Sequence, residues 1–259
     1  MSAQTVWIIG AGGRIGGLLA GMVQGPWAPV GLRRGDVGAA LGAPGPAAPI
    51  VVCARNDDLD AVLAEVHPSR HLDLVFLQNG MFQPALAQRG LLEATQGVLY
   101  VAVTHPGADP VPGGPSALWG RWADTLAGMM QAHGVEAQAV NRPSLQREIA
   151  VKLAWICCFG LWGEREQTTV GALLDGHRAG LRALCDELHP LLVAALGLDL
   201  DERALWGRVE AYGERVRHFP ARLKERRWRN GWVVAEGQTR AIPTPLHDRL
   251  LAESDARGA

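Results

Sequence analysis

The sequence predicts an α/β domain with a parallel sheet, followed by a domain made only of helices. Over the first ~100 residues, short apolar runs rich in β-branched residues alternate with helical runs, which is the pattern of βαβ units. After a loop marked by prolines and glycines at 105–115, apolar residues recur at helical spacing. We therefore expect two domains, 1–142 and 143–259, each large enough for its own core.

The expected elements alternate in the first half and are helical in the second. The predicted strands are Thr5–Ile9, Pro29–Leu32, Ile50–Ala54, His71–Leu77, Gly97–Val103 and Val135–Val140. The predicted helices are Leu18–Val23, Leu59–Val66, Leu118–His133, Pro143–Trp162, His177–Leu196 and Glu202–Arg217. Pro143 is placed at a helix start because a proline fits the first turn, where its missing N–H breaks no hydrogen bond. We expect the tail from Glu253 to Ala259 to be frayed.

Composition and charge exclude several classes of function. A net charge of -1 and a pI of 6.7 provide no basic field for binding nucleic acid. The four cysteines lack metal-site spacing and lie in apolar stretches, which predicts buried thiols in a reducing cytoplasm and no metal site. The first residues lack the basic segment of an export signal, and no apolar run approaches the roughly 18 residues that span a bilayer. We expect a cytoplasmic protein without a membrane partner that acts on a small molecule.

A glycine-rich loop, GAGGRIGG beginning at Gly10, joins the first expected strand to the first expected helix. Gly10 allows a tight turn, Gly12 or Gly13 lets the backbone approach a pyrophosphate, and Gly16 lets helix and strand pack closely. The spacing fits GxxGxxG better than GxGxxG, whose third glycine would fall on Ile15. The predicted cofactor contacts are Gly10, Gly12, Gly13, Arg14, Ile15 and Gly16. The context predicts a Rossmann-like dinucleotide site, and the alternative is a connection that binds nothing.

Two arginines follow the second expected strand, where an NAD-binding fold usually places a carboxylate for the ribose hydroxyls. The guanidinium of Arg33 or Arg34 suits the 2′-phosphate of NADP through charge-assisted hydrogen bonds. The sequence therefore favours NADP(H) as cofactor. The carboxylate of Asp36, close behind the arginines, leaves NAD as a possible cofactor. If the glycine loop binds no nucleotide, the alternative is a solvated pair of surface arginines.

One lysine has unusual chemical surroundings. Lys152 lies on an otherwise apolar helix face with Ile149, Leu153 and Ile156, and it is one of only two lysines in the chain. Burial disfavours the ammonium form, so the pKa of Lys152 can fall into the range in which it donates a proton near neutral pH. The alternative is a surface lysine whose amine stays in water.

These features resemble the ketopantoate reductase family. The resemblance rests on GAGGRIGG, the arginine after the second strand, LQNGM at Leu77–Met81, the later lysine, and the order of Asn230-Gly231 and IPTP at Ile242–Pro245. It implies that Lys152 is catalytic, with Glu225 as its carboxylate. It also implies that Asn79 contacts both the cofactor and the substrate. Arg55, after the third strand, would face the cofactor or the substrate, and we assign it to the cofactor. The implied substrate contacts are Asn79, Lys152, Ile156 and Asn230.

The sequence departs from the family at the substrate. Ile156 and Gly160 occupy the positions one and two turns after Lys152 where the family has asparagines, and no serine occurs between Ser144 and Ser254. Recognition of a polar substrate rests on a few placed hydrogen bonds, so ketopantoate itself is not the expected substrate. A larger or more apolar substrate fits the tryptophan-rich second half, although core packing or a homodimer interface also explains the tryptophans.

We expect hydride transfer from NADPH to the carbonyl carbon of a 2-oxo acid or related ketone bound between the two domains. Lys152 would protonate the oxygen, Asn79 would orient nicotinamide or substrate, and Glu225 would position the lysine or a substrate hydroxyl. Two alternatives remain: a non-catalytic NADP-binding sensor or interaction protein of the same fold, and a dehydrogenase that reduces an imine. The basic run Arg215–Arg229 is interpreted first as a solvated face, and otherwise as a clamp for an acid substrate or a subunit contact.

Overall fold

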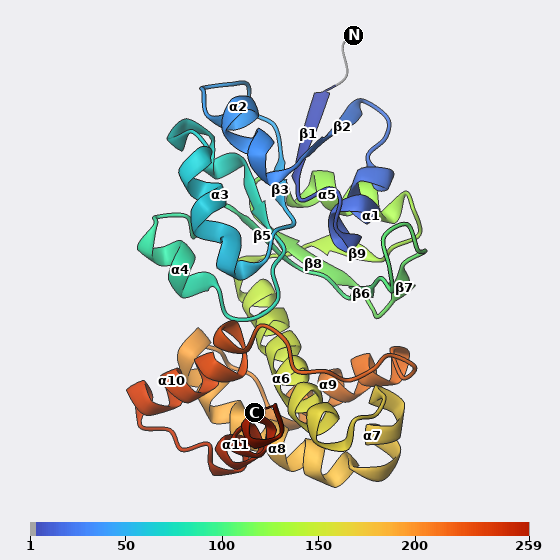
Figure 1. The fold of residues 1–259 in the computed structure, drawn as a ribbon, viewed down its shortest axis with the longest axis vertical. Coiled ribbons are helices and arrows are strands. Elements are labelled where there is room, and N and C mark those ends of the chain that lie inside the picture. Colours follow the sequence, from blue (N-terminus) through green and yellow to red (C-terminus); the bar gives the residue numbers. More distant parts are fainter. Residues whose placement is uncertain (1–3, 259) are drawn as a thin grey trace. The chain divides into compact units, whose positions relative to one another are not determined.

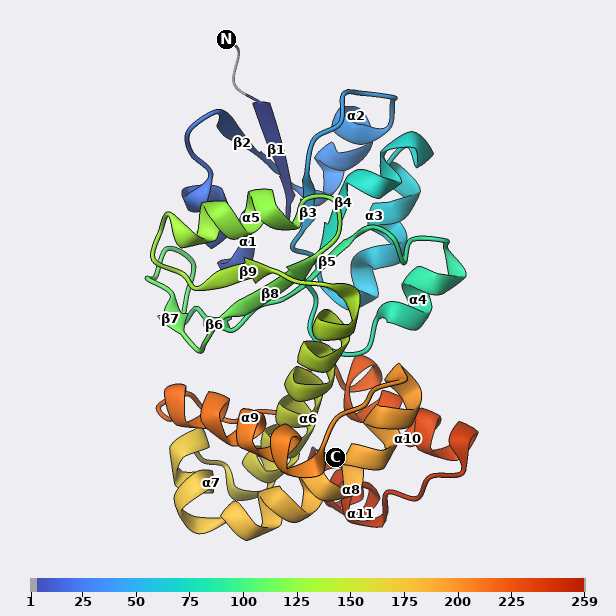
Figure 2. The same cartoon turned by 180° about the vertical axis from the view of Figure 1, so that it is seen from behind.

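The computed structural model describes residues 4–258, and the chain divides into two compact units (Figure 1; Figure 2 gives the reverse view). The first unit runs from the first strand to Gln78 and continues over Phe82–Leu145. The second unit comprises Asn79–Met81 and the chain from Gln146 onward. The expected α/β class of the first half and the expected helical class of the second half are both confirmed.

The first unit is built on a seven-stranded sheet with the order β2-β1-β3-β4-β5-β8-β9. The strands are β1 (Gln4–Ile9), β2 (Trp27–Leu32), β3 (Ile50–Val52), β4 (Leu74–Phe76), β5 (Thr95–Val98), β8 (Ser116–Trp119) and β9 (Ala137–Ala139), and a separate hairpin consists of β6 (Val101–Ala102) and β7 (Val111–Pro112). The pair β5–β8 is antiparallel, whereas the other neighbours in the large sheet are parallel. Strands β3 and β4 are entirely apolar and buried, as central strands covered on both faces must be.

Helices cover this sheet and complete the core of the first unit. They are α1 (Arg14–Met22), α2 (Val37–Leu41), α3 (Leu59–Glu65), α4 (Gln83–Gln88) and α5 (Ala123–Gln131). Helices α1 and α5 lie on the same face, because Leu19, Leu126 and Met130 belong to one buried cluster with Val6 and Ile8 of β1. This packing holds the start of α1, and therefore the glycine loop, against the end of β1.

Two expectations for this unit are wrong. The run Leu118–His133 is not one helix: it begins in strand β8, turns at Gly120 with φ +112°, and becomes helical at Ala123. The apolar side chains of the strand continue the helical spacing, so periodicity alone could not separate the two elements. The strand expected over Gly97–Val103 is divided between β5 and the hairpin strand β6.

The second unit is helical, and its first helix begins in the first unit. The helices are α6 (Arg142–Glu166), α7 (Val170–Gly176), α8 (Arg178–Leu196), α9 (Glu202–Arg215), α10 (Asn230–Arg240) and α11 (Pro245–Gly258). Helices α6, α8 and α9 correspond to the three that the sequence predicts after residue 142. Between residues 146 and 258, β-type pairing is limited to one isolated bridge, from Thr169 to Pro220.

The last two helices were not expected. The tail, predicted to fray from Glu253, is helical to Gly258, and the residue after it lies outside the described range. Glu187 of α8 stabilises the start of α11, because its two carboxylate oxygens accept the backbone N–H groups of Leu246 and His247 at 2.8 Å each. A carboxylate there satisfies otherwise unpaired donors and favours the helix dipole.

Candidate functional site

The glycine loop has the geometry that the sequence predicts. Gly10 has φ +83°, and a Cβ added to Gly16 would lie 2.2 Å from the carbonyl oxygen of Gly10, so neither position accepts a side chain without strain. Gly13 forms the N-cap of α1, and its N–H donates to the Gly10 carbonyl at 2.9 Å. Apart from its two chain neighbours, no heavy atom of the described residues lies within 4 Å of a Cβ added to Gly12, so the backbone is open on that side. An anion can therefore approach the N–H groups at the start of α1.

Two further cations lie at the same edge of the sheet. Strand β1 lies between β2 and β3 in a parallel arrangement, so the loops that follow these three strands share one edge. Arg33 follows β2 and Arg55 follows β3, and both side chains are exposed. Asp36 is turned back and accepts the backbone N–H of Arg33 at 3.0 Å, whereas Arg34 pairs with Asp58 at 2.7 Å. Arg33 is thus the cation at the end of β2 that a phosphate could reach.

Gln78, which the sequence analysis did not single out, supports this edge. Its amide Nε2 donates to the carbonyl oxygens of Val52 at 2.8 Å and Ala54 at 3.2 Å. These bonds connect the end of β4 to the backbone just before Arg55.

Two other predicted cofactor contacts lie at the start of α1. Arg14, the first residue of α1, donates to the Val103 carbonyl at 3.4 Å, and Ile15 is half-buried against the apolar cluster under the sheet.

Lys152 lies on α6 and is buried in the second unit, with 7% of its surface exposed. Its Nζ donates a 2.7 Å hydrogen bond to the hydroxyl of Tyr212 and lies 4.1 Å from the centroid of that ring and 5.6 Å from that of Trp155. Burial, and to a smaller extent the positive charge of Arg229, lower the pKa of Lys152 to about 7. The amine can therefore take up or release a proton near neutral pH.

Tyr212, the hydrogen-bond partner of Lys152, is a site residue that sequence reasoning missed. It lies on α9, and its ring is 4.6 Å from that of Trp155, which in turn stacks on Phe159 at 5.1 Å. Burial raises the pKa of Tyr212, so the hydroxyl stays protonated and neutral. The available signal was weak: Tyr212 is one of two tyrosines and shares an apolar face of its helix with Leu205 and Val209.

Glu225 and Arg229 form a second polar pair in this unit. Arg229 donates from Nη2 to Glu225 Oε2 at 2.5 Å, and its side chain is 9% exposed. The Arg229 Nε is buried and has no hydrogen-bond partner in the described structure. Glu225 has φ +44°, a left-handed conformation that costs roughly 1 kcal/mol for a residue other than glycine. Glu225, the predicted catalytic carboxylate, is thus paired with Arg229, which the sequence marks only as the last residue of the basic run.

Of three predicted substrate contacts, Asn230 and Ile156 are buried and Asn79 is exposed. Asn230 is completely buried, and its Nδ2 contacts His247 Nε2 at 3.1 Å and the Cys157 carbonyl at 3.5 Å. Ile156 is buried on α6, one turn after Lys152. Asn79 is exposed and belongs with the second unit, together with Gly80 and Met81. The structure therefore brings Asn79 into the unit of Lys152 and buries the amide of Asn230.

The contacts of Asn79–Met81 show why this segment belongs there. The N–H of Met81 donates to the Trp228 carbonyl at 2.7 Å. Gly80 has φ +96°, and a Cβ on it would lie 2.5 Å from the same oxygen. Glycine is required at this close approach, which places the Asn-Gly-Met turn against the residue that precedes Arg229.

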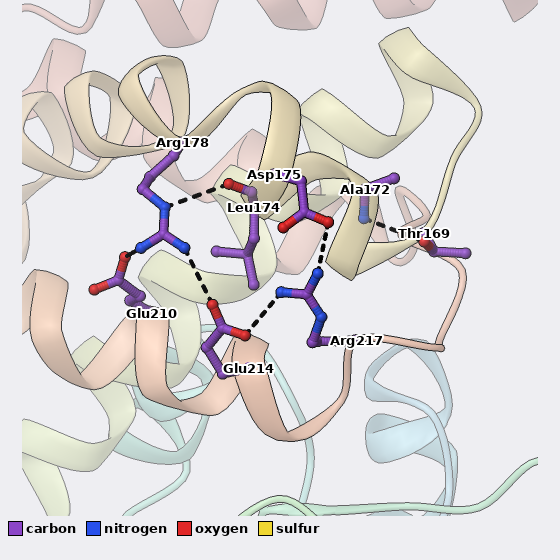
Figure 3. A network of polar contacts seen from close by, with 8 residues as sticks. All are labelled: Thr169, Ala172, Leu174, Asp175, Arg178, Glu210, Glu214 and Arg217. Carbon is purple, nitrogen blue, oxygen red and sulfur yellow. Dashed lines mark hydrogen bonds and ion pairs between the residues drawn. The ribbon is translucent and has the colours of Figure 1, made fainter.

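Arg217, Arg226 and Arg229 of the basic run Arg215–Arg229 form ion pairs within the second unit. In Figure 3, Arg217 reaches Asp175 of α7 and Glu214 of α9, while Arg178 of α8 contacts Glu214 from the other side. Such exposed pairs contribute little stability individually, but together they connect three helices. These contacts fit the interpretation of this part of the run as a solvated face, from which the buried Arg229 departs.

The remaining titratable clusters give no sign of metal chemistry. Within residues 4–258 no group of three or more His, Cys, Asp or Glu side chains is arranged to hold a metal ion, and no helix described there could cross a membrane. Burial raises the pKa of Cys53 and Cys157 to about 12, so these thiols stay protonated at neutral pH.

Comparison with known proteins identifies the fold. No family model matches the chain, and no curated protein matches its sequence. A ketopantoate reductase from Ralstonia eutropha JMP134 matches with a TM-score of 0.69 at 18% identity, over 98% of this chain and 97% of the other. D-mandelate dehydrogenase with NADH and anilino(oxo)acetate matches with a TM-score of 0.73 at 14% identity, over 99% and 100%. A dimeric ketopantoate reductase from Staphylococcus aureus matches with a TM-score of 0.68 at 17% identity, over 97% and 98%. The chain therefore has the fold shared by ketopantoate reductases and D-mandelate dehydrogenase.

Proposed function

We propose that the protein is an NADP(H)-dependent reductase that transfers a hydride to the carbonyl of a 2-oxo acid or related ketone. One observation carries the proposal: Lys152 is buried on α6, is held by Tyr212, and has a pKa of about 7. Such an amine can give its proton to a carbonyl oxygen as negative charge develops there. The fold, found in reductases and a dehydrogenase that act on this kind of compound, supports the same reaction type.

The residues of the first unit fit a dinucleotide. The Gly10–Gly16 turn and the open backbone at Gly12 leave space for a pyrophosphate at the start of α1. Arg33 supplies a cation for the 2′-phosphate, which supports NADP(H), and Arg55 supplies another at the neighbouring strand end. When bound, the cofactor supplies the hydride. In this proposal residues 1–142 bind cofactor and residues 143–259 bind most of the substrate.

Each candidate site residue of the second unit has a separate part in the proposal. Lys152 holds the proton and gives it to the carbonyl oxygen, while the Tyr212 hydroxyl fixes the position of Nζ. Asn79 orients the nicotinamide or the carbonyl. Glu225 acts through Arg229, to which the structure pairs it. Asn230, whose amide is buried against His247, is better explained as a packing residue than as a substrate contact.

The surroundings of the lysine favour a bulky, apolar substrate. Ile156 replaces a polar residue of the resembled family, and the rings of Trp155, Phe159 and Tyr212 pack together beside Lys152. Aromatic faces favour a planar apolar group over a small hydroxylated one. We propose an aromatic 2-oxo acid such as phenylglyoxylate, a choice that the D-mandelate dehydrogenase structure with anilino(oxo)acetate also supports.

NADPH oxidation by the purified protein tests this function. The substrates are ketopantoate, pyruvate and phenylglyoxylate, with NADH compared to NADPH. Lys152→Met should lower kcat by ~100-fold or more without changing NADPH affinity, since a general acid contributes about that factor. Lys224→Met, at the exposed second lysine, is the matched control and should keep full activity. Arg33→Ser should weaken NADPH binding and leave NADH binding unchanged.

Other results would redirect the proposal. Tight NADPH binding without oxidation by any ketone would contradict it and favour a non-catalytic NADP-binding sensor. Oxidation that requires an added amine would indicate imine reduction. We also propose a homodimer, as in the Staphylococcus aureus reductase, and light scattering after size exclusion measures it directly.

A further inference from the structure

A buried arginine of the first unit has no partner for its charge. Arg70 lies in the short 3₁₀-helix Pro68–Asp73 that precedes β4, and 3% of its surface is exposed. Its Nε and Nη2 are buried without a hydrogen-bond partner, and no carboxylate of residues 4–258 forms an ion pair with it. Burying a charge without a partner is costly, so an anion bound to Arg70 would stabilise this part of the unit.

The acidic side chains of the neighbouring elements are engaged elsewhere. Asp73 accepts a hydrogen bond from Nη1 of Arg121 at 3.1 Å, and Glu65 accepts the backbone N–H of Gly38 at 2.9 Å. Burial lowers the pKa of Arg70, and the charge of Asp73 acts in the opposite direction from beyond ion-pair distance. The guanidinium stays charged at neutral pH all the same, since arginine is not deprotonated in proteins.

The two unpaired nitrogens are the ones with which an arginine binds a carboxylate. The N–H groups of Nε and Nη2 point in parallel from one edge of the guanidinium, and the two oxygens of a carboxylate match their spacing. Arg70 thus lacks partners along one complete edge. A single carboxylate would supply both acceptors and the one negative charge that is missing.

The guanidinium lies against an aromatic ring and a loop. Its Cζ is 5.6 Å from the centroid of the Trp7 ring, and a Cβ added to Gly45 would lie 3.3 Å from its Nη1. Gly45 belongs to the covering loop, residues 43–47, which is exposed and made only of alanine, proline and glycine. The covering loop therefore offers apolar surface but no charged or polar side chain to Arg70.

The covering loop is held only at its ends. The Gly42 N–H donates to the Gly38 carbonyl at 2.9 Å on one side, and the Pro49 carbonyl accepts the Trp7 N–H at 2.9 Å on the other. Between these two bonds, residues 43–47 form no hydrogen bond with any residue of the described range. The covering loop can therefore move away from Arg70 without breaking a hydrogen bond of its own.

Arg70 lies at the opposite edge of the sheet from the glycine loop. The covering loop and the helix of Arg70 precede β3 and β4, and Trp7 is level with Ile50 and Leu74, the first residues of these two strands. The predicted cofactor contacts follow the strands instead. A ligand on Arg70 would therefore bind apart from the predicted cofactor site.

We propose that Arg70 is a binding site for the carboxylate of a small organic acid with an apolar body, admitted when the covering loop moves aside. The carboxylate binds to Nε and Nη2, and the apolar body lies against Trp7 and the covering loop. The site is separate from the proposed reduction and does not depend on it.

The test is a titration of the ¹⁵N-labelled full chain with benzoate, followed by NMR of the tryptophan indole and arginine Nε–H signals. Trp7→Phe and Arg70→Met identify the two signals by their absence. Benzoate should shift both signals in a saturable way. Benzamide has the same shape without the charge and should bind at least ~10-fold more weakly.

Variants locate the binding. Arg70→Met should abolish the benzoate shift of the Trp7 signal, whereas Arg89→Met, at an exposed arginine of the same unit, is the matched control and should keep it. Arg33→Ser and Lys152→Met, at the predicted cofactor and catalytic residues, should also keep it.

A carboxylate built into the covering loop gives a second test that needs no ligand. The added Cβ of Gly45 lies beside the guanidinium, so Gly45→Asp should pair with Arg70 and prevent benzoate binding. Its melting temperature should exceed that of Gly45→Asn, which has the same shape without the charge, by ~2 °C or more. In an Arg70→Met background the two variants should melt at the same temperature.

The inference fails if benzoate shifts neither signal, or if Arg70→Met keeps the benzoate shift of the Trp7 signal. A shift lost in Lys152→Met or Arg33→Ser but kept in Arg70→Met would place the acid at the predicted reductase site and refute the inference. Should Arg70→Met not fold, the comparison of Gly45→Asp with Gly45→Asn decides the matter, and equal melting temperatures refute it.

Discussion

Lys152→Met should stabilise the protein, and more strongly at lower pH. The unfolded lysine binds a proton below its usual pKa of 10.5, but the folded lysine does so only below about 7. Between these values unfolding takes up a proton, so the free energy of unfolding of wild type falls as pH falls and then levels off below 7. Methionine, of similar size, cannot titrate and removes this dependence.

The magnitude follows from the pKa difference. At about 1.36 kcal/mol for each pH unit, the fall from 10.5 to about 7 corresponds to ~5 kcal/mol, an upper limit for the cost of charging the buried amine. Between pH 9.5 and 7.5 the stability of Lys152→Met relative to wild type should rise by ~2–3 kcal/mol. The lost hydrogen bond to Tyr212 subtracts about 1 kcal/mol at every pH in this range and does not alter the slope.

Urea unfolding followed by circular dichroism at pH 7.5, 8.5 and 9.5, in the presence of a reductant, measures the two free energies. The buried cysteines also make stability depend on pH, but they are present in both proteins and cancel in the difference. Lys224→Met, at an exposed lysine, should give a difference that does not change with pH. A pH-independent difference for Lys152→Met would show that the amine is not desolvated and would refute the reasoning.

Three further predictions concern other residues. Gly16→Ala should lower the free energy of unfolding by ~2 kcal/mol or more, whereas Gly12→Ala should leave stability unchanged and weaken NADPH binding, because its methyl group would fill the space proposed for the pyrophosphate; urea unfolding and NADPH fluorescence measure the two effects, and equal losses of stability would contradict the packing seen at Gly10. Tyr212→Phe keeps the ring but loses the bond to Lys152, so kcat should fall ~10-fold with little change in KM and the pH profile of kcat should shift; an unchanged profile would remove Tyr212 from the site. Burial lowers the pKa of His247, so stability should fall as pH drops through 6.5, and His247→Gln should flatten that part of the stability profile measured by thermal unfolding.

Local features of the sequence predicted the geometry of the glycine loop. The glycine loop is one contiguous segment, and the conformations of Gly10 and Gly16 follow from contacts within it and with the adjoining strands. The burial of Lys152 was also foreseeable, because its neighbours on the same helix face are apolar. Each inference needed only the spacing of residues within one or two elements.

Contacts between distant elements could not be predicted in the same way. Tyr212 lies 60 residues from Lys152 and looks in the sequence like any core aromatic residue of an amphipathic helix. Arg229 ends a run of arginines in which Arg217 and Arg226 form exposed ion pairs, and nothing in its spacing shows that it alone is buried. Strand β8 was missed because Leu118 and Trp119, its last two residues, also fit the period of the helix that follows.

The hydrogen bond from Met81 to Trp228 has a consequence for the order in which the chain can fold. Its two partners are separated by roughly 150 residues, so a ribosome completes the Asn-Gly-Met turn long before it makes the carbonyl that receives it. During synthesis the turn must wait while α6 to α9 are made. A fragment that starts at Gln146 would lack the turn altogether and leave the Trp228 carbonyl without this donor. The helical unit therefore becomes complete only when the chain from Gln146 onward and three residues from the early chain are both present, which makes its folding a late and non-local event.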